Sequence, residues 1–431
     1  MKRKITSFLK SWKNSPHRKP LIVQGARQVG KTWSVLEFGR EQYDNVAYFN
    51  FETTPSLAAT FAEDISPASL LPVLSHICGQ TIVRGQTLIV FDEVQLCERA
   101  LTSLKYFCEQ APEYHVVVAG SLLGVAVNRA RFSFPVGKAD IVTMRPMDME
   151  EFLWALGEED VAARARECFD ANAAMPAALH DAAMKLYREY LAVGGMPECT
   201  AQYAATRDFT LVRHIQDTIL TGYLNDMSKY NTTVEIKKTR LAYDSAAVQL
   251  SRRNTRFQYK LVKKGARASE FENALEWLDL SGIISRVFRA EQIRKPLENY
   301  KTIDDFKIYY SDTGLLCAHN GLTAADVLYM DATMDDFKGG LTENYVNSQL
   351  TANGYRACYW ESDRGAEVDF IIERDGQIIP VEVKSSDNVQ AKSLKQYVAA
   401  YNPAYAIKLS ARNFGFENGI KTVPLYAAFC V

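Results

Sequence analysis

The chain has 431 residues, of which 47% are apolar, so it can bury several hydrophobic cores and we expect about two to four domains. Its 50 Lys and Arg residues balance its 51 Asp and Glu residues, which excludes nucleic-acid binding driven by overall charge and requires a local patch instead. The eight cysteines form no CxxC pair, so neither a zinc site nor a disulfide framework is expected, and reduced cysteines are typical of a cytoplasmic protein.

The N-terminal residues MKRKITSFLKSWKNS have a basic tip but lack the apolar core of a signal peptide. Ile5, Phe8, Leu9 and Trp12 are spaced to share one face, which predicts an amphipathic helix. No stretch of the sequence approaches the roughly 18 consecutive apolar residues of a membrane-spanning helix. We therefore expect a cytoplasmic protein without a membrane partner.

The segment PLIVQGARQVGKTWSVLEF predicts a buried strand, a glycine-containing loop and a helix in direct succession. The loop matches the GxxxxGK[ST] pattern of a phosphate-binding loop in the strand-to-helix context that the pattern requires. Backbone N–H groups of such a loop surround phosphate oxygens, its lysine reaches the β- and γ-phosphates, and its threonine supplies an oxygen to Mg²⁺. The predicted cofactors are ATP and Mg²⁺, and the predicted binding residues are Gly25, Ala26, Arg27, Gln28, Val29, Gly30, Lys31 and Thr32.

A second signal is TLIVFDEVQ, in which four apolar residues run into Asp92 and Glu93. A continuous apolar run is typical of a strand that is covered on both faces. The end of this strand would place Asp92 beside the metal, held through water, while Glu93 would orient or deprotonate the attacking water molecule. Lys31 and Glu93 are therefore the predicted catalytic residues of an ATPase, with Thr32 and Asp92 as metal ligands.

Further strand-like segments at 46–52, 115–121 and 139–146 alternate with helical segments. This alternation predicts an α/β domain with a largely parallel sheet. Ser121 ends the strand that follows the Asp-Glu pair, where a polar side chain can sense the γ-phosphate of bound ATP. A simple role as a turn residue is the alternative for Ser121.

Positive charge for a neighbouring subunit's nucleotide could come from Arg129, Arg131 or Arg145. Surface arginines are common, so the sequence does not identify an arginine finger among them. A homo-oligomer is compatible with these residues, and the oligomeric state stays open.

The segment SRRNTRFQYKLVKKGAR contains seven basic residues and no acidic one. Phe257 and Tyr259 are interleaved with the basic residues, a pattern that favours contact with DNA phosphates, although a solvated protein face is the alternative. The following residues, ASEFENALEWLDLSGIISRVF, predict a helix and then a pair of strands, which is the order of a winged helix. We call the basic residues the basic segment 252–267, and they are Arg252, Arg253, Arg256, Lys260, Lys263, Lys264 and Arg267.

Near the C-terminus, GAEVDFIIERDGQIIPVEVKSS predicts two antiparallel strands joined by a tight turn at Asp375-Gly376. Glu382 and Lys384 are two residues apart on one strand and therefore point to the same face. Asp369 on the preceding strand and Glu382 could share Mg²⁺ or Mn²⁺, while Lys384 offsets charge at a scissile phosphate.

This D…ExK arrangement is typical of metal-dependent nucleases. Glu343, on a predicted helix upstream, would add a third carboxylate to the two strand residues. The predicted catalytic residues are Asp369, Glu382 and Lys384, and the predicted metal ligands are Glu343, Asp369 and Glu382. A fold can outlive its chemistry, so a salt-bridged face without cleavage stays open as the alternative.

Seven blocks of the sequence, taken in order, resemble a widespread prokaryotic family of AAA-class ATPases. The blocks are GARQVGKT, VFDEVQ, AGSLL, PMDMEEFL, YLAVGGMPE, KIYYSDTGLL and GAEVDFII…VEVK. Members of this family carry a C-terminal domain of unknown function that is similar to the restriction-endonuclease fold. The chain departs from the family at Gly137-Lys138, where relatives usually carry Gly-Arg, and lysine lacks the planar fork that would suit phosphate sensing.

The resemblance covers nearly the whole chain and implies an α/β protein with four successive parts. We expect a P-loop ATPase domain over 1–155, a helical connector over 156–230, a winged-helix-like domain over 231–330 and an α/β restriction-endonuclease-like domain over 331–431. Two functions remain open at this point. The chain either couples its nucleotide state to a nuclease-like domain acting on DNA, or is an ATP-gated module that binds DNA or protein through an inactive nuclease-like fold.

Overall fold

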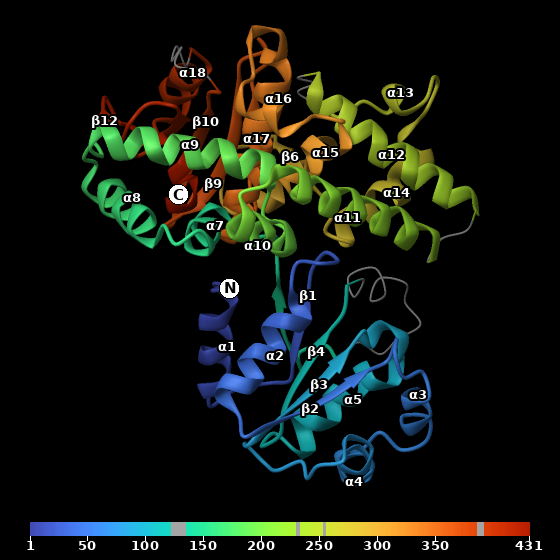
Figure 1. Ribbon diagram of the computed structural model, residues 1–431. Coiled ribbons are helices and arrows are strands. Elements are labelled where there is room, and N and C mark those ends of the chain that lie inside the picture. Colours follow the sequence, from blue (N-terminus) through green and yellow to red (C-terminus); the bar gives the residue numbers. More distant parts are fainter. Residues whose placement is uncertain (122–134, 230–232, 253–255, 386–391) are drawn as a thin grey trace. The chain divides into compact units, whose positions relative to one another are not determined.

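The computed structural model describes residues 1–121, 135–229, 233–252, 256–385 and 392–431. The chain divides into two units (Figure 1). The N-terminal unit contains Lys2–Arg145 with Leu280–Gly282, and the C-terminal unit contains Pro146–Asp279 and Ile283–Val431 together with Met1. None of the described helices is both long and apolar enough to cross a lipid bilayer.

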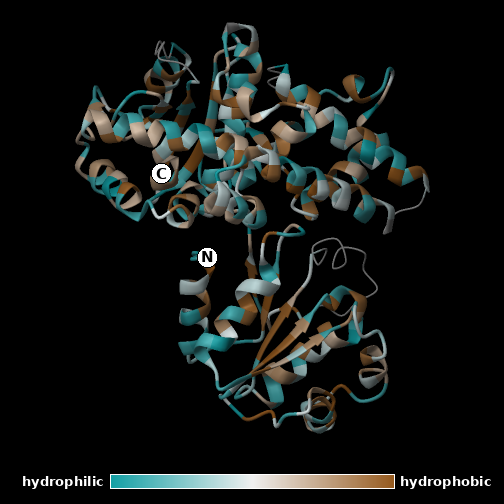
Figure 2. Cartoon of the chain, viewed as in Figure 1, coloured by the Kyte–Doolittle hydropathy of each residue, from teal (hydrophilic) through white to brown (hydrophobic). Residues whose placement is uncertain are grey.

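The N-terminal unit is built on a parallel sheet, as its alternating sequence pattern predicts. In the described residues its strand order is β2-β3-β4-β1-β5, and every neighbouring pair is parallel. All six residues of β3 are buried, and the strands of this sheet are mostly hydrophobic (Figure 2). The strands are β1 (Leu21–Gln24), β2 (Asn45–Asn50), β3 (Thr87–Asp92), β4 (His115–Ala119) and β5 (Asp140–Thr143).

Helices and aromatic side chains complete this unit. Phe91 of β3 packs against Phe49, Phe51 and Phe61 with ring centroids 5.5 to 6.1 Å apart. The predicted amphipathic helix exists as α1 and buries Leu9 and Trp12, but Phe8 is 40% exposed and does not share the buried face. The helices are α1 (Ile5–Asn14), α2 (Lys31–Gln42), α3 (Leu57–Thr60), α4 (Pro67–Cys78), η1 (Val94–Leu96) and α5 (Glu98–Gln110).

The C-terminal unit contains a larger mixed sheet. Its order in the described residues is β12-β13-β11-β10-β9-β8-β6-β7. The predicted hairpin is present: β9 and β10 are antiparallel, and Asp375 and Gly376 both have positive φ, as a tight two-residue hairpin turn requires. The strands are β6 (Ile284–Ala290), β7 (Lys301–Tyr310), β8 (Cys358–Glu361), β9 (Glu367–Arg374), β10 (Gln377–Val383), β11 (Ala406–Ser410), β12 (Gly415–Glu417) and β13 (Ile420–Pro424).

The strand pair predicted as a wing is part of the larger sheet. β6 and β7 form an antiparallel hairpin, and β6 also pairs in parallel with β8, where Phe288 lies opposite Cys358. The hairpin thus extends the sheet of the C-terminal region, so a boundary at 330/331 does not separate two sheets. A local alternation of apolar residues predicts a strand but does not show which strand lies beside it.

The helices of this unit begin before the predicted connector. α7 (Met149–Ala155) was expected at the end of the ATPase domain, but the unit boundary falls at Arg145/Pro146 and α7 packs against α8, α9 and η4. The other helices of the unit are α8 (Glu159–Ala171), α9 (Ala177–Val193), α10 (Pro197–Thr206), α11 (Phe209–Lys229), α12 (Thr233–Ser251), α13 (Tyr259–Val262), α14 (Ala268–Leu280), η2 (Leu297–Tyr300), α15 (Thr313–His319), α16 (Ala324–Leu328), η3 (Ala332–Met334), α17 (Asp335–Ala352), α18 (Lys392–Tyr401) and η4 (Leu425–Cys430).

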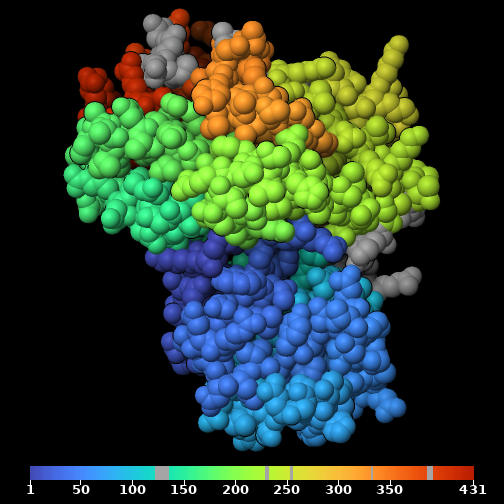
Figure 3. Space-filling model, viewed as in Figure 1, coloured from blue at the N-terminus to red at the C-terminus, as the bar shows by residue number. Residues whose placement is uncertain are grey.

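These helices pack on one another and on the sheet. α9 contacts α15 and α16, and Figure 3 shows the green and orange segments of this region pressed together at the surface. At the centre, Tyr345 of α17 is fully buried against Tyr187 and Tyr190 of α9, with centroids 4.9 and 5.6 Å away. This packing fixes α17, which carries one of the predicted site residues.

Candidate functional site

The predicted phosphate-binding loop lies between β1 and α2, and its backbone needs glycine at both ends. Gly25 has φ +143°, and a Cβ atom there would lie 2.1 Å from the carbonyl oxygen of Met144. Gly30 has φ +88° and directly precedes α2. Any other residue would strain these two positions, so the loop conformation follows from the motif.

Lys31 is held inside the loop rather than extended into solvent. Its side chain is buried, and its Nζ donates to the carbonyl oxygens of Gly25 at 2.9 Å and of Ala26 at 2.7 Å. The ammonium is thus kept at the mouth of the loop, where phosphate oxygens would compete with these carbonyl groups.

Asp92 ends β3 and brings together residues from three segments. Its Oδ2 accepts hydrogen bonds from Thr32 Oγ1 at 2.9 Å, from Tyr48 OH at 2.7 Å and from Asn50 Nδ2 at 3.4 Å. The pair of Thr32 and Asp92 was predicted, and an adjacent hydroxyl and carboxylate fit the Mg²⁺ that accompanies ATP. Burial raises the pKa of Tyr48 to about 12, so the phenol stays protonated and donates to Asp92.

Sequence reasoning missed Tyr48 and Asn50. They lie on β2, whose parallel register places Asn50 opposite Asp92 and Tyr48 opposite Val90. The available signal was two polar residues in the segment VAYFNFE, but the register that brings them to Asp92 is set by the sheet.

Glu93 follows Asp92 with a left-handed backbone, φ 51°. Its Oε2 accepts a hydrogen bond from the side-chain amide of Gln95. Burial raises the pKa of Glu93, and the charge of Asp92 raises it further, while Lys31 acts in the opposite direction. A carboxylate with a raised pKa is better matched to accepting a proton from water near neutral pH.

The remaining predicted residues of this unit have mixed outcomes. Ser121 is buried and lies two residues after the end of β4. Arg129 and Arg131 lie outside the described residues, and the carbonyl oxygen of Arg145 accepts a hydrogen bond from Arg3 at 2.8 Å. Lys138, at the position where relatives carry arginine, forms an ion pair with Glu109 at 3.0 Å.

In the C-terminal unit, the predicted nuclease-like residues do lie together. Glu343 on α17, Asp369 on β9, and Glu382 and Lys384 at the end of β10 meet in one group, in which Lys384 Nζ contacts Glu382 Oε1 at 2.5 Å. Two further residues belong to it that the sequence did not reveal, Lys307 of β7 and Glu367 of β9. We call these six residues the carboxylate cluster.

Lys307 lies among the carboxylates of the cluster. Its Nζ is 2.5 Å from Glu367 Oε1, 3.5 Å from Glu343 Oε2 and 4.0 Å from Asp369 Oδ1. Glu343 Oε2 also accepts a hydrogen bond from Tyr309 OH at 3.1 Å. Although burial opposes its charge, the neighbouring carboxylates hold the pKa of Lys307 above its usual value, so it remains an ammonium.

The cluster does not fit the shared metal ion that the motif implies. No group of three or more His, Cys, Asp or Glu side chains in the described ranges is arranged to hold a metal ion. Asp369 Oδ2 accepts from the backbone N–H of Val383 at 2.7 Å, and burial together with the charges of Glu343 and Glu382 raises the pKa of Asp369 well above its usual value. An ammonium therefore supplies the positive charge that was expected from the metal.

The basic segment 252–267 is only partly available to a ligand. Arg256 pairs with Asp305 at 3.2 Å and with Glu361, and Phe257 stacks on Phe306 with centroids 5.9 Å apart. Tyr259 donates to Glu272 at 2.9 Å. Both aromatic side chains are thus engaged in contacts within the protein, and both are half-buried.

Other basic residues of this segment do reach solvent. Arg253 lies outside the described residues. The exposed basic residues are Arg252, Lys260, Lys263, Lys264 and Arg267.

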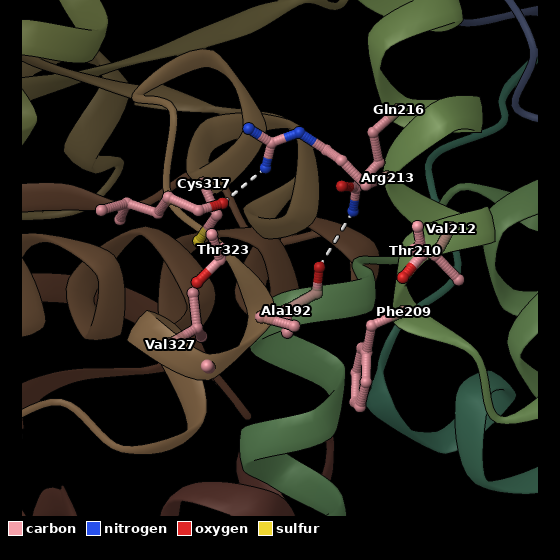
Figure 4. Close-up of a pocket in the computed structure, with 12 residues that line it drawn as sticks. Ala192, Phe209, Thr210, Val212, Arg213, Gln216, Cys317, Thr323 and Val327 are labelled. Carbon is pink, nitrogen blue, oxygen red and sulfur yellow. Dashed lines mark hydrogen bonds between the residues drawn. The ribbon is translucent and has the colours of Figure 1, made fainter.

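A cavity of about 380 Å³ lies elsewhere in the C-terminal unit, lined by residues of α11, α15 and α16 and by the end of α9. Figure 4 shows Arg213 and Gln216 of α11 at its edge. Arg213 donates to the carbonyl oxygen of Leu322, and Gln216 donates to that of Ala192 at 2.9 Å. Both side chains thus tie helices together, and none of the residues predicted for a site lines this cavity.

Three family models match separate stretches of the chain. Residues 17–153 match the AAA domain, and residues 184–326 and 338–428 each match a domain of unknown function (DUF8612 and DUF4143, respectively). The first stretch contains the phosphate-binding loop and Asp92, and its match to the AAA domain supports a P-loop ATPase domain there. The other two matches give no activity for the remainder of the chain.

Solved structures that are similar to the chain include proteins from three different organisms. The ORC2 protein of Aeropyrum pernix is 12% identical, over 81% of this chain and 94% of that chain, with a TM-score of 0.36. The RuvB Holliday junction branch migration motor of Thermotoga maritima is 17% identical over 66% and 88%, with a TM-score of 0.28. Drosophila ORC bound to DNA is 14% identical over 73% and 84%, with a TM-score of 0.28. No curated protein matches the chain.

Proposed function

We propose that the chain binds ATP with Mg²⁺ in its N-terminal unit and hydrolyses it. The observation that carries this proposal is the hydrogen bond of 2.9 Å between the hydroxyl of Thr32 and the carboxylate of Asp92. It joins the phosphate-binding loop to the end of β3 and lies next to Glu93, so ligands for the metal and a base for water occupy one site.

The protein's own residues have distinct roles in this proposal. The N–H groups of the loop bind the phosphates, and Lys31 exchanges the carbonyl oxygens of Gly25 and Ala26 for phosphate oxygens. Thr32 and Asp92 would hold Mg²⁺, which when bound neutralises charge on the phosphates. Glu93 orients the attacking water and accepts its proton, and its raised pKa suits that role.

Phosphate release by the full chain tests this proposal directly. We expect Glu93→Gln to bind ATP as the parent does but to hydrolyse it roughly a hundredfold more slowly, the lower end of what a general base contributes. Glu41→Gln is the matched control, because Glu41 is exposed on α2 and makes only a 4.0 Å ion pair with Lys10. Equal rates for Glu93→Gln and the parent would contradict the assigned role.

For the C-terminal unit we propose ATP-gated binding of DNA rather than cleavage. Lys307 within the carboxylate cluster favours binding over the nuclease alternative, since its ammonium lies 3.5 Å from Glu343 and 4.0 Å from Asp369, two of the three carboxylates expected to hold the metal ion of cleavage. The exposed side chains of Lys260, Lys263 and Lys264 support a DNA contact, because phosphates are bound by accessible cations.

Salt dependence of DNA binding tests this second proposal. Each phosphate contact contributes about 0.9 to the slope of log affinity against log salt, so Lys263→Gln/Lys264→Gln should lower the slope by about 1 to 2. The control is Lys392→Gln/Lys395→Gln, which removes two exposed lysines from α18. Binding that is insensitive to salt, or a slope unchanged in the first variant, would contradict the proposed interface.

A further inference from the structure

We infer that the ammonium of Lys307 replaces a divalent cation in the carboxylate cluster, and that removing this ammonium would turn the cluster into a divalent-cation site. This inference concerns the C-terminal unit alone and does not depend on ATP hydrolysis or on DNA binding.

The position of Lys307 is the first observation behind the inference. Three carboxylates from two different elements converge on its Nζ, with Glu367 at 2.5 Å, Glu343 at 3.5 Å and Asp369 at 4.0 Å. The ring of Tyr359 lies 5.3 Å from the same nitrogen. Carboxylates that surround one point are the usual surroundings of a hard divalent cation, and here an ammonium lies at that point.

Burial keeps the ammonium of Lys307 in this position. The side chain of Lys307 is only 4% exposed, and its strand neighbours Phe306 and Ile308 are buried as well. Moving the ammonium out of this site would separate it from Glu343, Glu367 and Asp369 and leave their negative charges without a partner. Breaking a buried ion pair leaves an uncompensated charge and is strongly destabilising, so a metal ion would not displace Lys307.

The oxygen atoms of the cluster are nevertheless held in place by other contacts. Tyr309 donates to Glu343, and the N–H of Val383 donates to Asp369. These bonds do not involve Lys307, so Glu343 and Asp369 stay tethered when the ammonium is removed, and only side-chain shifts are needed for the carboxylates to close on an ion. Oxygen ligands of this kind suit Mg²⁺ and Mn²⁺.

One atom of the cluster lacks a partner. Glu382 Oε2 is buried without a hydrogen bond, whereas its Oε1 contacts Lys384 at 2.5 Å. A single oxygen of this kind needs one proton donor, such as a water molecule, while Mg²⁺ takes about six oxygen ligands. With Lys307 absent, this oxygen and those of Glu343 and Asp369 would be available together.

Thermal unfolding of the full, nucleotide-free chain in EDTA and in millimolar Mn²⁺ tests the inference. We expect Lys307→Met to unfold at a lower temperature than the parent in EDTA. Adding Mn²⁺ should raise the unfolding temperature of this variant by about 5 °C, the increase that corresponds to an Mn²⁺ concentration about a hundredfold above Kd. Adding Glu382→Gln should abolish that gain. Lys301→Met is the control, because Lys301 lies on the same strand but its ammonium pairs with Glu298 at 2.8 Å and lies over the ring of Phe288, neither of which belongs to the carboxylate cluster.

All variants keep the nucleotide site, so the change in unfolding temperature that Mn²⁺ causes in Lys301→Met measures the effect of Mn²⁺ at that site. A Lys307→Met chain that gains no stability from Mn²⁺ beyond this control would overturn the inference. If Lys307→Met does not fold, equilibrium dialysis of Mn²⁺ against the parent and Glu382→Gln still decides. A bound ion in the parent that Glu382→Gln loses would refute the replacement of metal by Lys307, and equal binding by the two chains would support it.

Discussion

Replacing Tyr48 with phenylalanine should weaken the use of Mg²⁺ by the nucleotide site. The phenol donates to Asp92 Oδ2 at 2.7 Å, the shortest of the three hydrogen bonds to that oxygen. Residues that orient a metal-binding carboxylate typically change metal affinity by about 10- to 100-fold when they are removed. Because Tyr48 is 37% exposed and Asn50 and Thr32 remain, we expect the lower end of that range, about tenfold.

The assay is the ATP hydrolysis rate as a function of free Mg²⁺. For Tyr48→Phe the Mg²⁺ concentration at half-maximal rate should rise about tenfold, while the rate at saturating Mg²⁺ stays close to that of the parent. Tyr114→Phe is the control, since Tyr114 OH interacts with Arg84 at 3.4 Å, away from Asp92. Superimposable Mg²⁺ curves for Tyr48→Phe and the parent would refute the positioning role of the phenol.

Three further predictions concern stability and the loop. Burial lowers the pKa of His115 to about 4, below its ordinary 6.5. The unfolded chain therefore takes up a proton first, so the free energy of unfolding should fall as the pH drops from 6.5 toward 4, and urea titrations should show a weaker fall in His115→Gln. Gly25→Ala should abolish ATP binding measured by calorimetry, because its Cβ would lie 2.1 Å from Met144 O; unchanged affinity would contradict the loop geometry. Arg256→Ala should lower the unfolding free energy by about 1 kcal/mol, because it removes the ion pairs of a partly exposed side chain with Asp305 and Glu361, yet leave the salt slope of DNA binding unchanged.

The loop and the carboxylates proposed for the nucleotide site could be named from the sequence because their signals are local. The loop from Gly25 to Thr32 carries its own backbone requirements, and Asp92 and Glu93 follow a continuous apolar strand. Tyr48 was missed because its role depends on the register between β2 and β3, which the sequence of either strand does not specify.

The carboxylate cluster could be predicted only in part for a related reason. Glu382, Lys384 and Asp369 belong to one hairpin, whose turn signal fixes their proximity. Lys307 comes from β7, which is separated from β9 in the sheet by β6 and β8, so sequence spacing gave no indication of it. The positive charge of Lys307 therefore comes from β7, a strand whose neighbours in the sheet could not be predicted from the sequence.

The basic segment illustrates a limit of counting charges. Arg256 and Lys260 look alike in the sequence, but the first is engaged by Asp305 and Glu361 whereas the second is exposed. The strands β7 and β8, which carry Asp305 and Glu361, distinguish them.

The central claim is that ATP binds at the loop containing Lys31 with Mg²⁺ between Thr32 and Asp92. Equilibrium binding of ATP to the parent and to Lys31→Ala, each with and without Mg²⁺, tests it most directly. Tight binding by the parent that depends on Mg²⁺ and is lost in Lys31→Ala is the predicted result. Failure of the parent to bind ATP at millimolar Mg²⁺, or equal binding by both chains, would contradict the account.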